Sequence, residues 1–398
     1  MSWSGDATVI DANSDGRPDV YMLNMQGADH LWLNDGGTRF HDATAKYFPR
    51  TPWGAMGAKV FDYNGDGRLD LFVTDMHSDM FTPIAPEDYT LEALPADPLA
   101  MPNDYFPDGK DAFVFGNALF ANRGSSQAKG ASPYEEVAYR AGVETYWPWG
   151  PSVDDINADG WDDILVISGM NFPYRYGPNA LLLNQGNGRF LAAAFTLGIE
   201  PRARGETQQV WFTLDCRAKG KDAGSKNCEL CARPDAGALG CQKVASGRYE
   251  MMAAKGGRSA VILDIDGDGD LDIVTNEFNA KPQVLVSDLA RRGINRALSV
   301  RLRGTRGNRQ GLGAEVTLVL ADGRRVLKVN DGKSGYLSQS DLPLYFGLGK
   351  ADHADSIVVR WPSGMVQTMG GPLAAGQLIE VTEPQAPWHS ALIRRSTR

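Results

Sequence analysis

Two features are missing from this sequence: long apolar runs and an excess of basic residues. No run of about 18 apolar residues occurs, so no transmembrane helix is expected. The 49 aspartates and glutamates outnumber the 40 lysines and arginines, and the net charge of −9 argues against a nucleic-acid partner. The opening residues Met-Ser-Trp-Ser-Gly-Asp also lack the charged and apolar regions of a signal peptide, and a trimmed or mis-assigned start would look the same.

Cysteine is scarce, and all four cysteines fall in one stretch, at Cys216, Cys228, Cys231 and Cys241. An even number of cysteines in a short Gly- and Lys-rich insertion favours two disulfides that staple a loop. A structural zinc site is the alternative, because Cys228 and Cys231 have the spacing of a zinc knuckle. The outer cysteines fit no familiar zinc finger, and the sequence leaves this choice open.

Catalytic signatures are also missing. The sequence contains no G-x-S-x-G nucleophile turn, no H-E-x-x-H zinc motif and no phosphate-binding glycine loop. The 5 histidines are scattered, and His77 is the one with carboxylates beside it, in Asp75-Met-His77-Ser-Asp79. A site built from several histidines is therefore not expected.

Glycine and proline, by contrast, are plentiful, with 45 and 22 residues, and glycine clusters in turn-like phrases between short apolar runs. This pattern predicts an all-β protein with many tight connections.

One acidic phrase, D-x-[ND]-x-D-G-x-x-D followed by an apolar strand, occurs four times, starting at Asp11, Asp62, Asp155 and Asp264. An Asn-x-Gly hairpin follows three copies, in HLWLNDGGTRF, NALFANRGSS and NALLLNQGNGRF, and a remnant, PQVLVSD, follows the fourth. One unit is thus strand, acidic loop, strand and hairpin, which makes a four-stranded antiparallel sheet. Radial repetition of such sheets predicts a β-propeller with four clear blades and up to six.

The acidic loops have the chemistry of calcium sites. Ca²⁺ binds six to eight oxygens, and side chains at loop positions 1, 3, 5 and 9 with a carbonyl at position 7 can converge around a glycine turn. The predicted side-chain ligands are Asp11, Asn13, Asp15, Asp19, Asp62, Asn64, Asp66, Asp70, Asp155, Asn157, Asp159, Asp163, Asp264, Asp266, Asp268 and Asp272, and the predicted carbonyl ligands are those of Arg17, Arg68, Trp161 and Asp270. We expect about four Ca²⁺ ions, one in each loop.

An EF-hand is the competing explanation, and loop position 12 argues against it. An EF-hand has a bidentate Glu there, whereas the four loops carry Met22, Val73, Val166 and Thr275. A metal-free Asp/Gly turn is the other alternative, but without a cation the crowded carboxylates of four such loops would repel one another. Flexible loops made of protein oxygens favour calcium over magnesium.

The repeat pattern also places the domain boundaries. The propeller is predicted over residues 1–290, with insertions near 76–112 and 211–255. From about Arg292 no acidic loop recurs, and alternating strands such as SVRLRG and SIVVRW predict a small β-sandwich-like domain over residues 291–384. Residues 385–398 form a tail.

The acidic loops and hairpins resemble FG-GAP/VCBS repeats, the blades of integrin-α-like propellers. The segments GTRGNRQGLGAEVTL (304–318), SGYLSQSDLPLYFGLG (334–349) and IVVRWPSG (357–364) resemble the ASPIC/UnbV domain that follows such propellers. The resemblance covers roughly residues 5–383. It implies a secreted or periplasmic calcium-binding propeller, with no established catalytic activity for the C-terminal domain. Family propellers usually have about seven blades, and a propeller with fewer would leave open sheet edges that invite a partner strand.

Two functions fit these observations. The first is a non-enzymatic, extracytoplasmic calcium-binding protein that acts in protein interaction, in adhesion or as a structural subunit of a larger assembly, with a protein partner or a saccharide as its ligand. The alternative is a propeller hydrolase with a pocket near His77, because propellers also host enzymes.

Overall fold

The computed structural model describes residues 3–76, 112–124, 131–169, 176–237, 240–278, 280–385 and 394–396. His77 and most of the predicted insertion near 76–112 lie outside these residues, as does most of the predicted tail. The described part is almost entirely β, in agreement with the all-β prediction.

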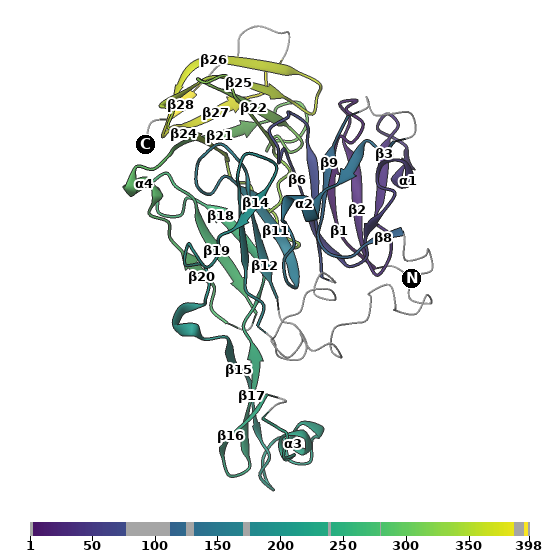
Figure 1. Ribbon diagram of the computed structural model, residues 1–398, viewed down its shortest axis with the longest axis vertical. Coiled ribbons are helices and arrows are strands. Elements are labelled where there is room, and N and C mark those ends of the chain that lie inside the picture. The colour runs from purple at the N-terminus through teal and green to yellow at the C-terminus, as the bar shows by residue number, and fades with distance from the viewer. Residues whose placement is uncertain are drawn as a thin grey trace.

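Four antiparallel sheets follow one another along the chain, and within each sheet the strands pair in sequence order (Figure 1). The first sheet holds β1 (Trp3–Ile10), β2 (Asp19–Met25), β3 (His30–Asn34) and β4 (Phe40–Asp42), and the second holds β6 (Ala55–Phe61), β7 (Asp70–Asp75), β9 (Ala118–Asn122) and β10 (Tyr134–Glu136). The third sheet holds β11 (Pro148–Asp154), β12 (Asp163–Ser168), β13 (Ala180–Asn184) and β14 (Phe190–Ala192). The fourth sheet holds β18 (Gly257–Leu263), β19 (Asp272–Glu277) and β20 (Gln283–Leu285). Three sheets have the predicted four strands, and the sheet with the hairpin remnant has three.

These sheets are blades that pack face to face. The inner strands β1, β6, β11 and β18 contact one another in that order. Successive residues of one strand point to opposite faces of its sheet. In β6 of the second blade, Val60 packs in the apolar core shared with the first blade and Phe61 in the core shared with the third. In β12, Ile164 and Leu165 divide in the same way. Burial on both faces explains why these strands read as continuous apolar runs.

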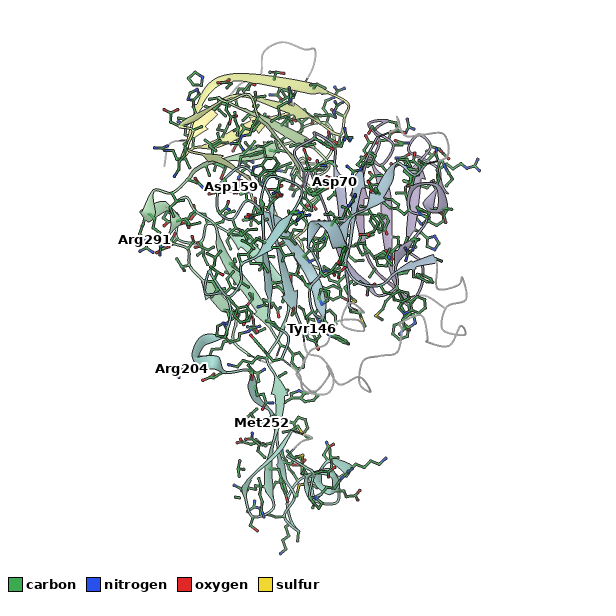
Figure 2. All side chains as sticks on the ribbon, in the orientation of Figure 1. Asp70, Tyr146, Asp159, Arg204, Met252 and Arg291 are labelled. Atoms are coloured by element: carbon green, nitrogen blue, oxygen red, sulfur yellow. A yellow bond between two sulfur atoms is a disulfide. The ribbon has the colours of Figure 1, made fainter. Side chains whose placement is uncertain are left out.

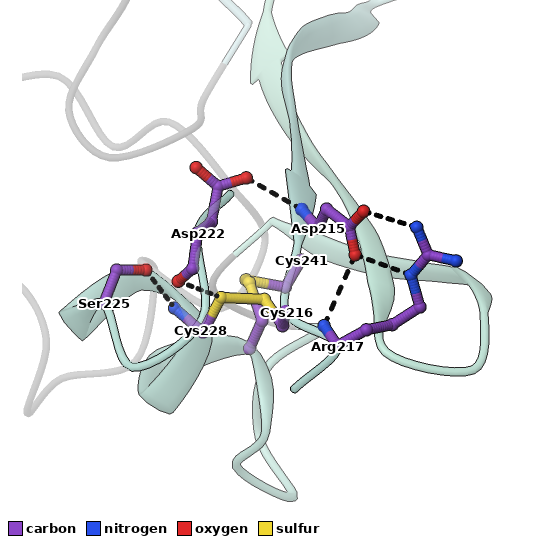
Figure 3. The surroundings of a disulfide bond; sticks show 8 residues. Asp215, Cys216, Arg217, Asp222, Ser225, Cys228 and Cys241 are labelled. Carbon is purple, nitrogen blue, oxygen red and sulfur yellow. Dashed lines mark hydrogen bonds and ion pairs between the residues drawn. A yellow bond between two sulfur atoms is a disulfide. The ribbon is translucent and has the colours of Figure 1, made fainter. Parts of the chain in front are cut away.

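A disulfide-bonded arm, formed by residues 208–254, projects away from the blades (Figure 1). It consists of a sheet of β15 (Gln208–Asp215), β17 (Arg248–Ala254) and β16 (Cys241–Ala245), with α3 (Lys226–Cys231) beside it. Cys216 bonds to Cys228, and Cys231 bonds to Cys241 (Figure 3). The two-disulfide prediction is therefore confirmed, and no thiol of these four cysteines remains to bind zinc.

The C-terminal domain consists of two four-stranded sheets around one apolar core that includes Trp361, Phe346 and Val316. One sheet holds β24 (Leu344–Gly349), β21 (Arg296–Arg303), β27 (Leu378–Thr382) and β28 (Arg394–Ser396), and the other holds β23 (Arg325–Val329), β22 (Glu315–Leu320), β25 (His353–Arg360) and β26 (Val366–Ala374). Short elements among the described residues are β5 (Thr51–Pro52), which pairs in parallel with β8 (Phe113–Val114), and the helical turns α1 (Thr44–Tyr47), α2 (Ala138–Ala141), α4 (Leu289–Arg292) and the 3-10 turn Ala203–Gly205.

A segment between β23 and β24, residues 330–343, joins the two domains because it reaches the inner strands of all four blades. Lys333 Nζ lies 2.6 Å from Asp6 Oδ2 in β1, and the carbonyl of Lys333 accepts a 2.8 Å hydrogen bond from Lys59 Nζ in β6. The Ser334 hydroxyl lies 3.2 Å from the Ser152 hydroxyl in β11 and donates to the Ala260 carbonyl in β18 at 2.8 Å. The C-terminal domain is thus anchored in the centre of the blades.

Candidate metal centres

The four acidic loops occupy the same place in every blade, between the inner strand and the next one: they join β1 to β2, β6 to β7, β11 to β12, and β18 to β19. Asp70 and Asp159 mark two of these loops, and both lie at the end of the blades that faces the C-terminal domain (Figure 2). The strand–loop–strand pattern therefore brings each set of predicted ligands into one loop.

The carboxylate at loop position 9 has the same two hydrogen bonds in every loop. In the second loop, Asp70 accepts hydrogen bonds from the backbone N–H of Tyr63 at 3.1 Å and of Asn122 at 2.7 Å. The equivalent pairs of donors are Ala12 and Asn34 for Asp19, Ile156 and Asn184 for Asp163, and Ile265 and Ser287 for Asp272. All four carboxylates are at most 1% exposed, so position 9 fixes the loop to its own blade.

The carboxylate at position 1 closes the loop turn. Asp62 accepts hydrogen bonds from the backbone N–H of Asp66 at 3.1 Å and of Gly67 at 2.8 Å. Gly67 has φ +80°, a left-handed conformation that side chains other than hydrogen rarely adopt. Asp11, Asp155 and Asp264 close their loops in a similar way. The position-1 carboxylate thereby ties the start of each loop to the glycine at position 6.

Burial makes four of the carboxylates in the first three loops difficult to ionise without a cation. Burial raises the pKa of Asp19 and of Asp62 to about 6. It raises the pKa of Asp70 and of Asp163 well above the usual range, and the position-1 carboxylates of their loops, Asp62 and Asp155, raise them further. A bound cation would favour the ionised forms.

The donor set fits calcium, although the four loops are not equal. In the fourth loop, ligand oxygens of Asp264, Asp266 and Asp268 lie within 4.8 Å of one another, which suits a hard cation that binds only oxygen. In the first and second loops, the position-7 arginine pairs with the position-5 carboxylate, Arg17 with Asp15 and Arg68 with Asp66. The guanidinium group of each arginine already offsets part of the negative charge in its loop.

The third loop also contacts the C-terminal domain. The Ala158 carbonyl accepts a 2.9 Å hydrogen bond from the Gly349 N–H, and the Asn157 carbonyl accepts one of 2.7 Å from Asn295 Nδ2. Lys328 Nζ lies 2.5 Å from Asp162 Oδ1, inside the same loop. The third loop is therefore part of the domain interface.

Sequence reasoning missed one supporting residue in each of the first three blades. Asn34, Asn122 and Asn184 donate their backbone N–H to the position-9 carboxylate. Their side-chain amides donate to the position-8 carbonyls of Pro18, Leu69 and Asp162, at 3.1–3.2 Å. The signal was present, because each is the Asn of the Asn-x-Gly hairpin, which predicts a turn but not a contact with the loop.

Comparisons with known proteins agree with this architecture. Residues 11–73 match the model of the FG-GAP-like repeat, and residues 304–387 match the model named ASPIC and UnbV. Human cartilage acidic protein 1 is 33% identical over 127 residues, which are 32% of this chain and 19% of that protein. The Xenopus tropicalis protein of that name is 29% identical over 141 residues, which are 35% of this chain and 21% of that protein. The Mus musculus protein is 32% identical over 130 residues, which are 32% of this chain and 20% of that protein.

The matched segments span about a fifth of the length of these relatives. The predicted resemblance is confirmed: this chain combines an FG-GAP-like repeat with an ASPIC and UnbV domain, and it is similar to cartilage acidic protein 1 over about a third of its length.

Proposed function

We propose that this protein is an extracytoplasmic, calcium-stabilised scaffold that binds another protein without catalysing a reaction. One observation carries the proposal: the same cage of backbone-bonded carboxylates recurs at the same place in four successive blades. The position-9 carboxylate is buried in all four loops, and a buried carboxylate destabilises a fold unless it is paired. Four such cages in one chain are best explained by a bound cation in each.

The residues that would hold calcium are the predicted ligands at positions 1, 3, 5 and 9 of each loop, with the position-7 carbonyls. When bound, the ion supplies positive charge beside the carboxylates of its loop. Because position 9 is hydrogen-bonded to the third strand of its blade, or to Ser287 just after β20, neutralising the loop would also stabilise the pairing of the strands.

The disulfides support a location outside the cytoplasm. Disulfide bonds persist in oxidising compartments, in secreted and periplasmic proteins among others, and this chain has two within one arm. Among the described helices, none is long and apolar enough to cross a membrane. Secretion or a periplasmic location is therefore part of the proposal.

Two open surfaces support binding of a protein partner. The fourth blade ends at β20, where Val284 and Val286 are 52% exposed, so its edge offers both backbone and apolar contacts. The projecting arm exposes Trp211 and Val244. Adhesion, or a place in a larger assembly, would use surfaces of this kind.

Native mass spectrometry of the full chain isolated with calcium from its source tests the function. We expect calcium-loaded protein in complex with a protein partner, and loss of the complex after chelation. An inert monomer under every calcium condition would contradict the scaffold. The hydrolase alternative stays a prediction that needs His77, and a turnover that His77→Ala removes would favour it.

A further inference from the structure

An open cavity of about 670 Å³, lined by both charged and apolar groups, lies between the base of the arm and the fourth blade. Its walls come from β15 and β17 on one side, from β19 and β20 on the other, and from the turn at Arg204. Figure 2 shows Arg204 beside the base of the arm and Met252 on an arm strand. The volume falls in the range of small-molecule sites, and none of the acidic loops contributes to the cavity.

The lining of this cavity is positive although the chain is acidic. Four cationic side chains line it, namely Arg202, Arg204, Lys255 and Lys281, against two anionic ones, Glu206 and Glu277. Lys255 pairs with Glu206 at 2.9 Å, and Arg202 pairs with Glu277 at 2.5 Å. Arg204 and Lys281 have no ion pair within the described part of the chain. The cavity therefore has two cations to offer to an anionic ligand.

The inner wall of the cavity holds buried polar atoms that lack partners. Arg202 is 3% exposed and is held by hydrogen bonds from its Nε to the Tyr176 hydroxyl at 3.0 Å and from its Nη1 to the side-chain oxygen Oε1 of Gln283. Its Nη2 donor and the Glu277 Oε2 acceptor have no hydrogen-bond partner among the described residues. Buried polar atoms without partners are rare in proteins. Both atoms are closed to solvent at the cavity wall, so a ligand hydroxyl, which donates and accepts, would satisfy them only where the wall side chains part.

The remaining lining groups indicate a polyhydroxylated ligand. The side-chain amide of Gln209 donates a hydrogen bond to the Phe278 carbonyl at 2.6 Å, which leaves the side-chain oxygen of Gln209 as an acceptor. Val210 and Met252 add apolar surface suited to the face of a sugar ring. The carboxylates of Glu206 and Glu277 accept hydrogen bonds from hydroxyls but repel a dianion such as phosphate.

Backbone strain occurs at the same place. Arg204 has φ +65°, a conformation that is strained for a residue other than glycine and that clusters at functional sites. This turn carries one of the two unpaired cations to the rim of the cavity.

From this geometry we infer that the cavity binds a carboxylated saccharide, with Arg204 and Lys281 on the carboxylate and Arg202, Glu277 and Gln209 on ring hydroxyls. The site is separate from the calcium loops and does not depend on the scaffold proposal. The base of the arm would thus recognise an acidic sugar.

Isothermal titration of the full chain in calcium buffer, with D-glucuronate, D-glucose and inorganic phosphate as probes, tests the site. We expect D-glucuronate to bind at least about tenfold more tightly than the other two, a difference of about 1.4 kcal/mol. Equal affinity for phosphate, or no binding of D-glucuronate, would overturn the inference.

Variants distinguish this cavity from the acidic loops. Arg204→Ala and Lys281→Ala, both at exposed positions, should each weaken D-glucuronate binding by about tenfold, whereas Lys243→Ala, at an exposed position of β16 away from the cavity, should leave it unchanged. Asp268→Asn in the fourth acidic loop should also leave it unchanged. If Asp268→Asn abolished binding and Arg204→Ala did not, the sugar would be bound at a metal loop and the inference would fail.

Discussion

Lys328 of the C-terminal domain and Asp162 of the third acidic loop form a buried ion pair, with Nζ 2.5 Å from Oδ1 and side-chain exposures of 7% and 6%. Asp154 lies 2.6 Å from the same Nζ. Burial by itself would lower the pKa of Lys328, but Asp154, Asp162 and Asp155 together raise it overall, so the ammonium group stays charged. One lysine therefore connects the C-terminal domain to a predicted metal loop.

Removing this lysine should destabilise the whole chain. Lys328→Met leaves the buried Asp162 and the half-buried Asp154 without this counter-charge, which should cost about 3–5 kcal/mol of unfolding free energy. Urea unfolding checks this, with Lys243→Met on the arm as an exposed control that should change stability by less than about 0.5 kcal/mol. The double variant with Asp162→Asn should recover part of the loss, and an unfolding midpoint equal to that of the wild type would contradict the role of the ion pair.

The hairpin asparagines should matter more than their turn role suggests. Asn122 is 5% exposed and its amide donates to the Leu69 carbonyl at 3.2 Å. Asn122→Ala should lower the unfolding free energy by about 1–3 kcal/mol, because the Leu69 carbonyl loses its donor and remains buried. Gln185→Ala, at an exposed hairpin position of the next blade, is the matched control. Equal effects of the two substitutions would show that the contact with the loop does not contribute.

The fourth loop should bind calcium more tightly than the second. Its Asp264, Asp266 and Asp268 oxygens converge, whereas Arg68 already pairs with Asp66 in the second loop. In calcium titrations, Asp268→Asn should remove one ion from the sites of highest affinity. The equivalent Asp66→Asn should remove one ion from sites whose calcium affinity is about tenfold lower. Loss from a single common class in both variants would show that the arginine has no effect.

Stability should fall with rising pH because of Asp29. This carboxyl is 0% exposed, accepts hydrogen bonds from the Tyr21 hydroxyl and the Asn24 N–H, and burial raises its pKa well above the ordinary value. The folded state then holds a proton that the unfolded state releases above about pH 4, so the unfolding free energy decreases as the pH rises towards the folded pKa.

Asp29→Asn removes this titration. Urea unfolding of both proteins at several pH values between about 4 and 8 should show that the stability of the variant relative to wild type increases with pH. The difference cancels the contribution of the other carboxylates. Parallel stability curves for the two proteins would mean that Asp29 is ionised throughout that range.

The local parts of this architecture could be predicted from sequence. Asp62, Asp66 and Gly67 lie within one short phrase, so their spacing encodes the turn, and the apolar run after Asp70 encodes a strand. The contacts between distant segments could not be predicted. Lys333 donates a hydrogen bond to Asp6, which lies 327 positions away in the sequence, and no local sequence pattern predicts such a pair.

The cavity at Arg202 was missed for the same reason. Its walls are drawn from Arg204 and β15, which precede the disulfide-bonded residues in the sequence, and from β17, β19 and β20, which follow them. The cysteines predict two disulfides, but their spacing does not indicate that positively charged side chains at the base of the arm lie opposite β19 and β20.

The calcium content and melting temperature of the full chain, measured before and after chelation, test the central claim most directly. Elemental analysis after dialysis against mixed calcium and magnesium should find about four calcium ions per chain. Chelation should lower the Tm by at least about 5 °C, and calcium but not magnesium should restore it. A chain without bound calcium, whose Tm is unchanged by chelation, would contradict the assignment of the four loops as metal centres.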